Sequence, residues 1–412
     1  MPAAISTSPG FLSMGKATLQ VSQEELFAKN RSKLLKELSQ SFAVSSGTDG
    51  GGGGGGVIFL QGGTNPERND SDHEPIFRQE SYFWYLTGVK EPDFAVAIEM
   101  IGENGSSKPR VTLFVPNLPA DYATIMGRIR TKEEWREHYQ VDDVQYTEDI
   151  EATLLHVLKV NNNSSSSEKK GVLYLMKGRN SDSGNLYEPP EYILQSKALQ
   201  DISIVDTEAL FPVLAECRVI KSPAELVLLQ HVTEVTSFAH AYVMRNIKPG
   251  NMEYQGESLF RHYCYYNYGC RLVGYTPICG CGPNAATLHY GHAGEPNDRE
   301  LQENDICLFD LGCEYQCYGS DITCSFPASG TFSEKQKLIY QGVLQAQIDV
   351  YNMLKPGVSW MDCHKAAEAA ILRQLIKMGL VQPGNTPVEE LVEQRLGAVF
   401  LPCGLGHFIG EY

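Results

Sequence analysis

ICLFDLGCEYQCYGSDITCSF, residues 306–326, holds two aspartates, Asp310 and Asp321, in sequence that is typical of β-strands. Asp310 lies within an apolar run, and apolar residues alternate after Asp321, which predicts two strands and a hairpin connection over residues 312–319. The hairpin would bring the carboxylates together in a largely buried sheet, where unpaired charge is costly. No lysine or arginine lies between residues 306 and 326, so the pair predicts a bound divalent cation. The alternative is that one aspartate caps a turn and the other reaches solvent.

The composition of the whole chain excludes several classes of protein. A length of 412 residues favours two domains, and 42% hydrophobic with 20% charged residues is typical of globular proteins. A net charge of −16 disfavours binding to nucleic acid or to an anionic membrane. No apolar run approaches the roughly 18 residues that a transmembrane helix needs. We therefore expect a globular protein without nucleic-acid or membrane partners.

The cysteines indicate a reducing compartment. There are 11 of them, an odd number, and none forms a C-x-x-C pair that would suggest structural zinc. Many alternate with apolar residues, as small buried side chains do. The sequence therefore predicts a cytoplasmic protein, and residues 1–20 are expected to form a disordered tail.

The N-terminal half reads as an α/β domain over residues 21–206. An amphipathic helix is expected over residues 24–41, and strands over 57–60, 95–100, 111–115 and 172–175. A capping box beginning at Thr131 predicts a helix start between them. Seven glycines at positions 50–56 lack the pattern of a phosphate-binding loop and predict a flexible surface loop.

The C-terminal half reads as a separate α+β domain over residues 215–412. A boundary is expected near residues 207–222, because Ser222, Pro223 and Glu225 form a strong helix start. That helix should run to about residue 247. Two further helices are expected over residues 334–354, after Ser333, and over 361–378, around short strands.

Three histidines lie in glycine-rich surroundings that allow a ligand to approach the backbone closely. His289 and His292 stand just upstream of the aspartate strands, and His407 lies between Gly406 and an aromatic residue. The alternative for each is a hydrogen-bonded structural histidine. Six other histidines lie on predicted helices and are expected to be structural or on the surface: His138, His156, His231, His240, His262 and His364.

Two aspartates and one histidine form an oxygen-rich donor set. Such ligands favour Mn²⁺ or Mg²⁺ over structural zinc. Two such ions about 3.5–4 Å apart could activate water and polarise an amide carbonyl. The residues alone therefore predict a metallohydrolase.

Five long segments carry a family resemblance. They are HEPIFRQESYFWYLTGV from residue 73, LPADYATIMGRI from 118, YTPICGCGPNAATLHYGHAGEPNDR from 275, FDLGCEYQCYGSDITCSFPASG from 309 and LGAVFLPCGLGHFIG from 396. With them, nearly everything from about residue 20 onward resembles the pita-bread metallopeptidases, also called creatinase/aminopeptidase-like, and most closely their prolidase (Xaa-Pro dipeptidase) branch. The resemblance implies a smaller N-terminal domain that contributes to a homodimer, and a catalytic pita-bread domain.

The resemblance assigns roles to five residues of this chain. Asp310 is similar to the family's terminal metal ligand, Asp321 to its bridging aspartate, and His407 to its histidine ligand. His289 resembles a histidine that contacts the substrate and stabilises the transition state, and Tyr275 a residue of the substrate pocket. The implied reaction is Mn²⁺-dependent hydrolysis of dipeptides with C-terminal proline or hydroxyproline, with two ions per subunit.

The chain departs from the family pattern near its C-terminus. The family has five protein ligands, of which two are glutamates well downstream of the histidine, whereas the sequence stops at Tyr412. Cys403 also stands where prolidases usually carry a histidine. We therefore expect a C-terminally truncated pita-bread domain that supplies three of five ligands, with little or no dipeptidase activity.

Two other interpretations remain open at this point. Aminopeptidase P shares part of the segment from residue 73, so an Xaa-Pro aminopeptidase is the nearest competing enzyme. Pita-bread folds without metals also serve as binding modules, but those relatives typically lose the residues that this chain retains at Asp310, Asp321, His289 and His407.

Overall fold

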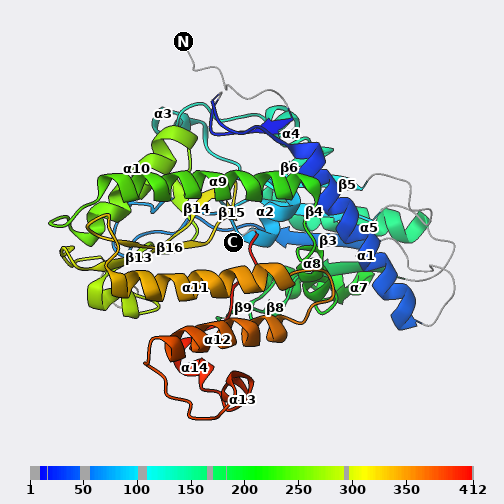
Figure 1. Cartoon of the computed structure of the whole chain (residues 1–412). Coiled ribbons are helices and arrows are strands. Elements are labelled where there is room, and N and C mark those ends of the chain that lie inside the picture. The colour runs from blue at the N-terminus through cyan, green and yellow to red at the C-terminus, as the bar shows by residue number, and fades with distance from the viewer. Residues whose placement is uncertain are drawn as a thin grey trace. The chain divides into compact units, whose positions relative to one another are not determined.

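A computed structural model describes residues 10–15, 17–46, 56–100, 109–164, 170–181, 183–291 and 297–410. The chain forms two compact units (Figure 1), one that reaches Leu228 and one that comprises Leu229–Gly410. The boundary falls within helix α9, Pro223–Asn246.

The first unit alternates short strands and helices. Its strands are β1 (Phe11–Leu12), β2 (Val21–Ser22), β3 (Gly56–Gln61), β4 (Ala95–Glu99), β5 (Arg110–Val115), β6 (Asp143–Tyr146), β7 (Gly171–Leu175), β8 (Gly178–Arg179), β9 (Leu186–Tyr187) and β10 (Ser203–Asp206). Its helices are α1 (Lys29–Ser46), α2 (Ser81–Thr87), α3 (Ala123–Met126), α4 (Lys132–Tyr139), α5 (Ile150–Ser164), α6 (Glu191–Leu194), α7 (Lys197–Ile202) and α8 (Leu210–Cys217).

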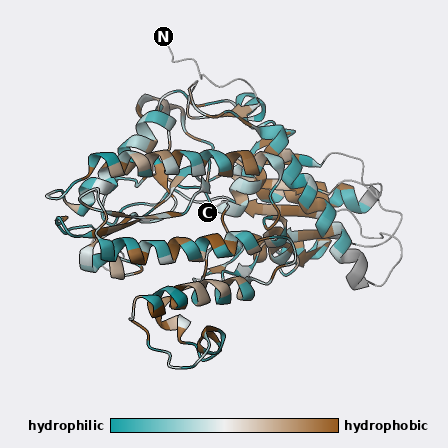
Figure 2. Ribbon diagram, in the orientation of Figure 1, coloured by the Kyte–Doolittle hydropathy of each residue, from teal (hydrophilic) through white to brown (hydrophobic). Residues whose placement is uncertain are grey.

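A mixed six-stranded sheet in the order β10-β7-β3-β4-β5-β6 organises this unit. Side chains alternate along each strand, so Val57 and Phe59 belong to one core, whereas Ile58 and Leu60 belong to the other. Helices α1, α2 and α8 supply apolar side chains to the second core, and α5 and α7 to the first. The strands are therefore hydrophobic on both faces. Figure 2 colours the strands of this sheet largely brown, and the predicted α/β fold is confirmed.

Two expectations for the N-terminal half need correction. Part of the expected disordered tail forms strand β1, which pairs antiparallel with β2 and buries Leu12 against Val21. The expected helix over residues 24–41 begins as a π-helical turn, Glu24–Ala28, and continues as α1. Of the glycine run, Gly56 is the first residue of β3, and the other glycines lie outside the described residues.

The second unit places helices around short strands. After α9 come α10 (Glu253–Tyr268), β11 (Leu272–Val273), β12 (Ile278–Cys281), β13 (Ile306–Leu311), β14 (Cys313–Tyr315), β15 (Tyr318–Gly319), β16 (Ile322–Pro327), α11 (Glu334–Met353), α12 (Trp360–Lys377), α13 (Val388–Glu393) and α14 (Gly397–Phe400). The predicted helix starts are confirmed, because Ser222 and Ser333 each accept a hydrogen bond from the backbone three residues onward.

The two aspartate strands form where the sequence predicts them, but their connection differs. β13 and β16 are neighbours in a three-stranded sheet of order β12-β13-β16. The connection is a second hairpin, β14 and β15, which joins β11 in another sheet. Gln316 and Cys317 make its tight turn at φ values of 51° and 60°, a backbone conformation that two-residue hairpin turns require.

Candidate metal centre

Asp310 and Asp321 lie on one face of the β12-β13-β16 sheet. Asp310 is opposite Thr323 in the β13–β16 ladder, and Asp321 is two residues before Thr323. Since side chains alternate along a strand, Asp310 and Thr323 point to the same side, and Asp321, directly before β16, lies next to them because the Tyr275 hydroxyl reaches both carboxylates. The opposite face of β13 is apolar, with Phe309 fully buried. The predicted proximity of the two carboxylates therefore follows from register, although both are half-buried rather than fully buried.

Tyr275 joins the two carboxylates. Its hydroxyl donates a short hydrogen bond to Asp310 Oδ1 and lies 3.3 Å from Asp321 Oδ1. A phenol carries one hydrogen, so it cannot fully satisfy both acceptors. The sequence predicted Tyr275 only as a residue of the substrate pocket, because nothing in the local pattern shows that its ring reaches the aspartates 35 and 46 positions away.

His407 approaches the same pair from the C-terminal segment. Its Nδ1 lies 3.4 Å from Asp321 Oδ2, and its side chain is 77% exposed. This segment is held to the second hairpin by a hydrogen bond from Gly319 N to Gly410 O. The structure thus brings His407, Asp321, Asp310 and Tyr275 together.

The electrostatics of the pair favour a cation. Burial and the neighbouring Asp310 charge raise the pKa of Asp321, and His407 only partly opposes this. Burial and the Asp310 carboxylate also raise the pKa of Tyr275 far above its usual value. Within the described part of the chain, neither aspartate pairs with a lysine or arginine. Two acidic groups held close together without a basic partner are an environment that a divalent ion would stabilise.

The donor chemistry fits a hard divalent metal ion, because carboxylate and imidazole ligands suit Mn²⁺ and related ions. The ligand set is nevertheless partial. Among residues 10–410, apart from the gaps given above, no group of three or more His, Cys, Asp or Glu side chains is arranged as a metal site. Asp310, Asp321 and His407 are therefore residues that could hold part of a metal site.

His289 lies on an exposed turn after a 3₁₀-helix, Gly282–Ala286. Its predicted contact with the substrate stays a prediction. His292, the other candidate upstream of the strands, lies outside the described residues.

A buried carboxylate organises the backbone around His289. Glu253 is completely buried, and its Oε1 accepts a hydrogen bond of 2.7 Å from Cys281 N. Its Oε2 accepts hydrogen bonds from the Tyr290 hydroxyl at 2.7 Å and from Arg299 N at 3.0 Å. Because Tyr290 directly follows His289, this network fixes the chain on one side of that histidine. Glu253 was not among the residues predicted from the sequence.

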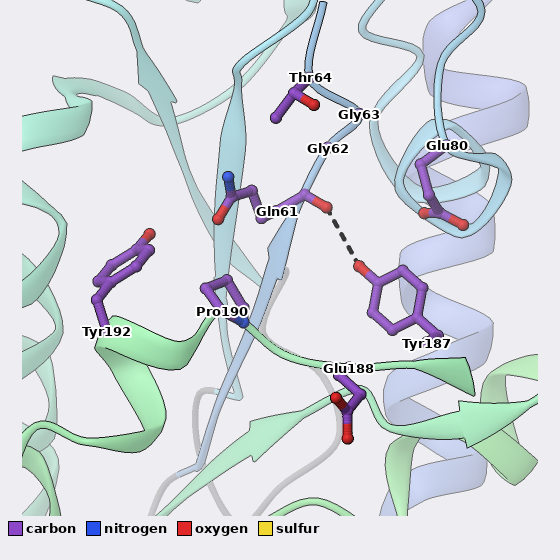
Figure 3. Close-up of a pocket in the computed structure, with 9 residues that line it drawn as sticks. All are labelled: Gln61, Gly62, Gly63, Thr64, Glu80, Tyr187, Glu188, Pro190 and Tyr192. Carbon is purple, nitrogen blue, oxygen red and sulfur yellow. Dashed lines mark hydrogen bonds between the residues drawn. The ribbon is translucent and has the colours of Figure 1, made fainter. Parts of the chain in front are cut away.

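A cavity of about 490 Å³ lies elsewhere, within the first unit (Figure 3). Its lining includes Glu80, Glu188 and Tyr192, and the Tyr187 hydroxyl donates a hydrogen bond to Gln61 O. Glu80 is already engaged, since its carboxylate accepts hydrogen bonds from two backbone amides at the start of α2. None of the predicted site residues lines this cavity, so it is distinct from the aspartate pair.

Comparison with known proteins identifies the class of this chain. Residues 227–412 match metallopeptidase family M24, and residues 27–165 match the aminopeptidase P N-terminal domain. The Xaa-Pro dipeptidases of Homo sapiens and Mus musculus are 43% and 42% identical over 407 residues, which cover 99% of this chain and 76% of each relative. A probable Xaa-Pro aminopeptidase of Talaromyces marneffei is 32% identical over 86% of this chain and 70% of its own length.

Solved structures of aminopeptidase P share the fold. The zinc-substituted Escherichia coli enzyme in complex with product has a TM-score of 0.75 and 25% identity, and it covers 95% of this chain and 81% of the bacterial chain. A putative aminopeptidase P from Bacillus anthracis has a TM-score of 0.72 with 25% identity, covering 90% of this chain and 80% of its own.

The chain belongs to metallopeptidase family M24. It is a hydrolase of the pita-bread type with a peptide substrate, and its family implies a divalent metal cofactor. The resemblance inferred from the five segments, the fold class and the enzyme class are thereby confirmed. Among the described residues, no helix is both long and apolar enough to cross a membrane.

Proposed function

We propose that this chain is an Xaa-Pro dipeptidase that uses manganese to hydrolyse dipeptides with C-terminal proline or hydroxyproline. The observation that carries the proposal is the Asp310–Asp321 pair, joined through Tyr275 and flanked by His407. Xaa-Pro dipeptidases that are 43% identical over 99% of the chain support this reaction over other peptide hydrolyses.

Each site residue has a proposed role. Asp310, Asp321 and His407 hold Mn²⁺, whose chemistry in such a site is to polarise a peptide carbonyl as a Lewis acid. Tyr275 keeps the two carboxylates at a fixed separation through its hydroxyl. His289, on its exposed turn, is assigned to contact the substrate.

The experiment is hydrolysis of Gly-Pro by residues 1–412 across a Mn²⁺ titration, with Mn²⁺ binding measured separately. We expect turnover that depends on Mn²⁺ and is lost in Asp321→Asn, which keeps the size of the side chain but removes its charge. Absence of Gly-Pro cleavage at every Mn²⁺ concentration would contradict the proposal.

An Xaa-Pro aminopeptidase is the second candidate. The TM-score of 0.75 to E. coli aminopeptidase P over 95% of the chain favours it. A tripeptide with proline in second position separates the two, because an aminopeptidase requires residues beyond the proline whereas a dipeptidase excludes them. Preferential cleavage of the tripeptide would replace the dipeptidase proposal.

The remaining proposals concern partners and location. We propose a cytoplasmic homodimer that does not bind nucleic acid, in accordance with the net charge of −16 and the free cysteines. Light scattering of the purified chain tests the dimer, and fractionation of cells that express it tests the location.

A further inference from the structure

Helix α9 presents two buried polar side chains on one face to the aspartate strands. Thr236 is fully buried and His240 is 3% exposed. They are four residues apart, so both project from the same side of the helix. From its place on a helix, His240 was expected to be structural or on the surface, and Thr236 was not among the predicted site residues.

Thr236 connects the two chain segments next to the aspartates. Its Oγ1 accepts a hydrogen bond of 3.1 Å from Cys313 N and lies 2.7 Å from Ser320 Oγ. Cys313 lies three residues after Asp310, and Ser320 directly precedes Asp321. The same segments meet again through the hydrogen bond from Ser320 N to Cys313 O, at 3.1 Å.

His240 contacts the residue that directly follows Asp321. Its Nε2 donates to Ile322 O at 2.9 Å, since a carbonyl can only accept. Burial lowers the pKa of His240.

These contacts lie at the end of the β13–β16 ladder, beside Asp310 and Asp321. The β13–β16 ladder ends at the Leu311–Ile322 pair, so Asp321 lies one residue beyond it. Contacts outside the ladder therefore help to hold Asp321 relative to Asp310. Tyr275 contacts the two carboxylates, and α9 contacts Ser320 and Ile322, the neighbours of Asp321, as well as Cys313, three residues after Asp310. A shift of a few tenths of an ångström in ligand position matters at a metal site, where ligand distances must hold within about 0.2 Å.

We propose that His240 and Thr236 are positioning residues that set the separation of Asp310 and Asp321 for metal binding. The inference rests on the proposed metal role of the aspartates. It assigns to α9 a function in the site although neither side chain touches an aspartate carboxylate in the contacts described above.

The test measures the Mn²⁺ affinity of the full chain and four variants, using the electron paramagnetic resonance signal of free Mn²⁺. His240→Phe keeps the ring but loses the donor, and His240→Gln restores a side-chain N–H. Thr236→Val keeps the shape of Thr236 without its hydroxyl. The matched control is His231→Phe on the same helix, because His231 Nε2 is buried without a hydrogen-bond partner in the described structure.

We expect His240→Phe and Thr236→Val to weaken Mn²⁺ binding by about 10-fold or more, which is typical when a group that orients a metal ligand is removed. His240→Gln should recover part of the affinity, and His231→Phe should bind as the unsubstituted chain does. Unchanged affinity in folded His240→Phe would overturn the inference; if that variant does not fold, unchanged affinity in Thr236→Val would do so. Gly-Pro hydrolysis is measured in parallel. If the unsubstituted chain binds Mn²⁺ but does not cleave the dipeptide, the proposed reaction is refuted, whereas the positioning role is still judged by the Mn²⁺ affinities of the variants.

Discussion

Replacing Gly312 by alanine tests whether the close approach of the backbone at Gly312 and Ser320 fixes the positions of Asp310 and Asp321. A Cβ atom at Gly312 would lie 1.7 Å from Ser320 O and 2.8 Å from Ser320 C. Gly312 is two residues after Asp310, and Ser320 directly precedes Asp321. An added methyl group therefore acts on the backbone of both metal-ligand candidates.

The size of the effect follows from this distance. Ordinary contact begins at 3.4 Å, so the segments must separate by the difference between 3.4 and 1.7 Å, which is 1.7 Å. Overpacking typically costs about 1–3 kcal/mol, and we expect the upper end because the obstructing atoms are backbone. For a unit of this size, about 3 kcal/mol corresponds to a decrease in Tm of about 6–12 °C. Displacement of the aspartates should weaken Mn²⁺ binding by at least about 10-fold.

Scanning calorimetry of Gly312→Ala measures the Tm of the second unit, and a Mn²⁺ titration measures the affinity. Gly404→Ala is the control for stability, since its Cβ would meet nothing within 4 Å. Equal Tm and equal Mn²⁺ affinity for Gly312→Ala and the unsubstituted chain would refute the reasoning, because the segments would then separate freely without moving the carboxylates.

Three further predictions concern other groups. Tyr290→Phe leaves Glu253 without a 2.7 Å donor, so we expect a loss of about 1–3 kcal/mol in unfolding free energy and a lower kcat on Gly-Pro with unchanged Mn²⁺ affinity. His407→Ala should weaken Mn²⁺ binding without lowering Tm, because its side chain is 77% exposed; a lower Tm with unchanged binding would contradict this. Burial and the charge of Arg130 lower the pKa of His138 to about 4, below its usual value of about 6.5. Between pH 6.5 and about 4, the unfolded chain therefore holds a proton on this histidine that the folded chain does not, so the free energy of unfolding decreases as pH falls. His138→Phe should reduce this loss of stability, which is measured by unfolding at several pH values.

Patterns that act over a few residues predicted much of the fold. An apolar run predicted β13 and alternating apolar residues predicted β16, and the serines at positions 222 and 333 predicted the starts of α9 and α11. The same local signals did not show the hairpin β14–β15, because its turn is made by Gln316 and Cys317 rather than by the usual glycine or asparagine. Domain limits and site roles stay predictions.

By itself, the sequence predicted from the strand patterns around Asp310 and Asp321 that the two carboxylates lie close together, and its five long segments indicated the metallopeptidase family. Only the tertiary structure decided how that pair is held. Tyr275 reaches it from 35 positions away, and His240 and Thr236 reach its flanks from about 80 positions away. Such contacts depend on which elements pack together. The sequence around a hydroxyl or an imidazole does not indicate which distant atom it will bind.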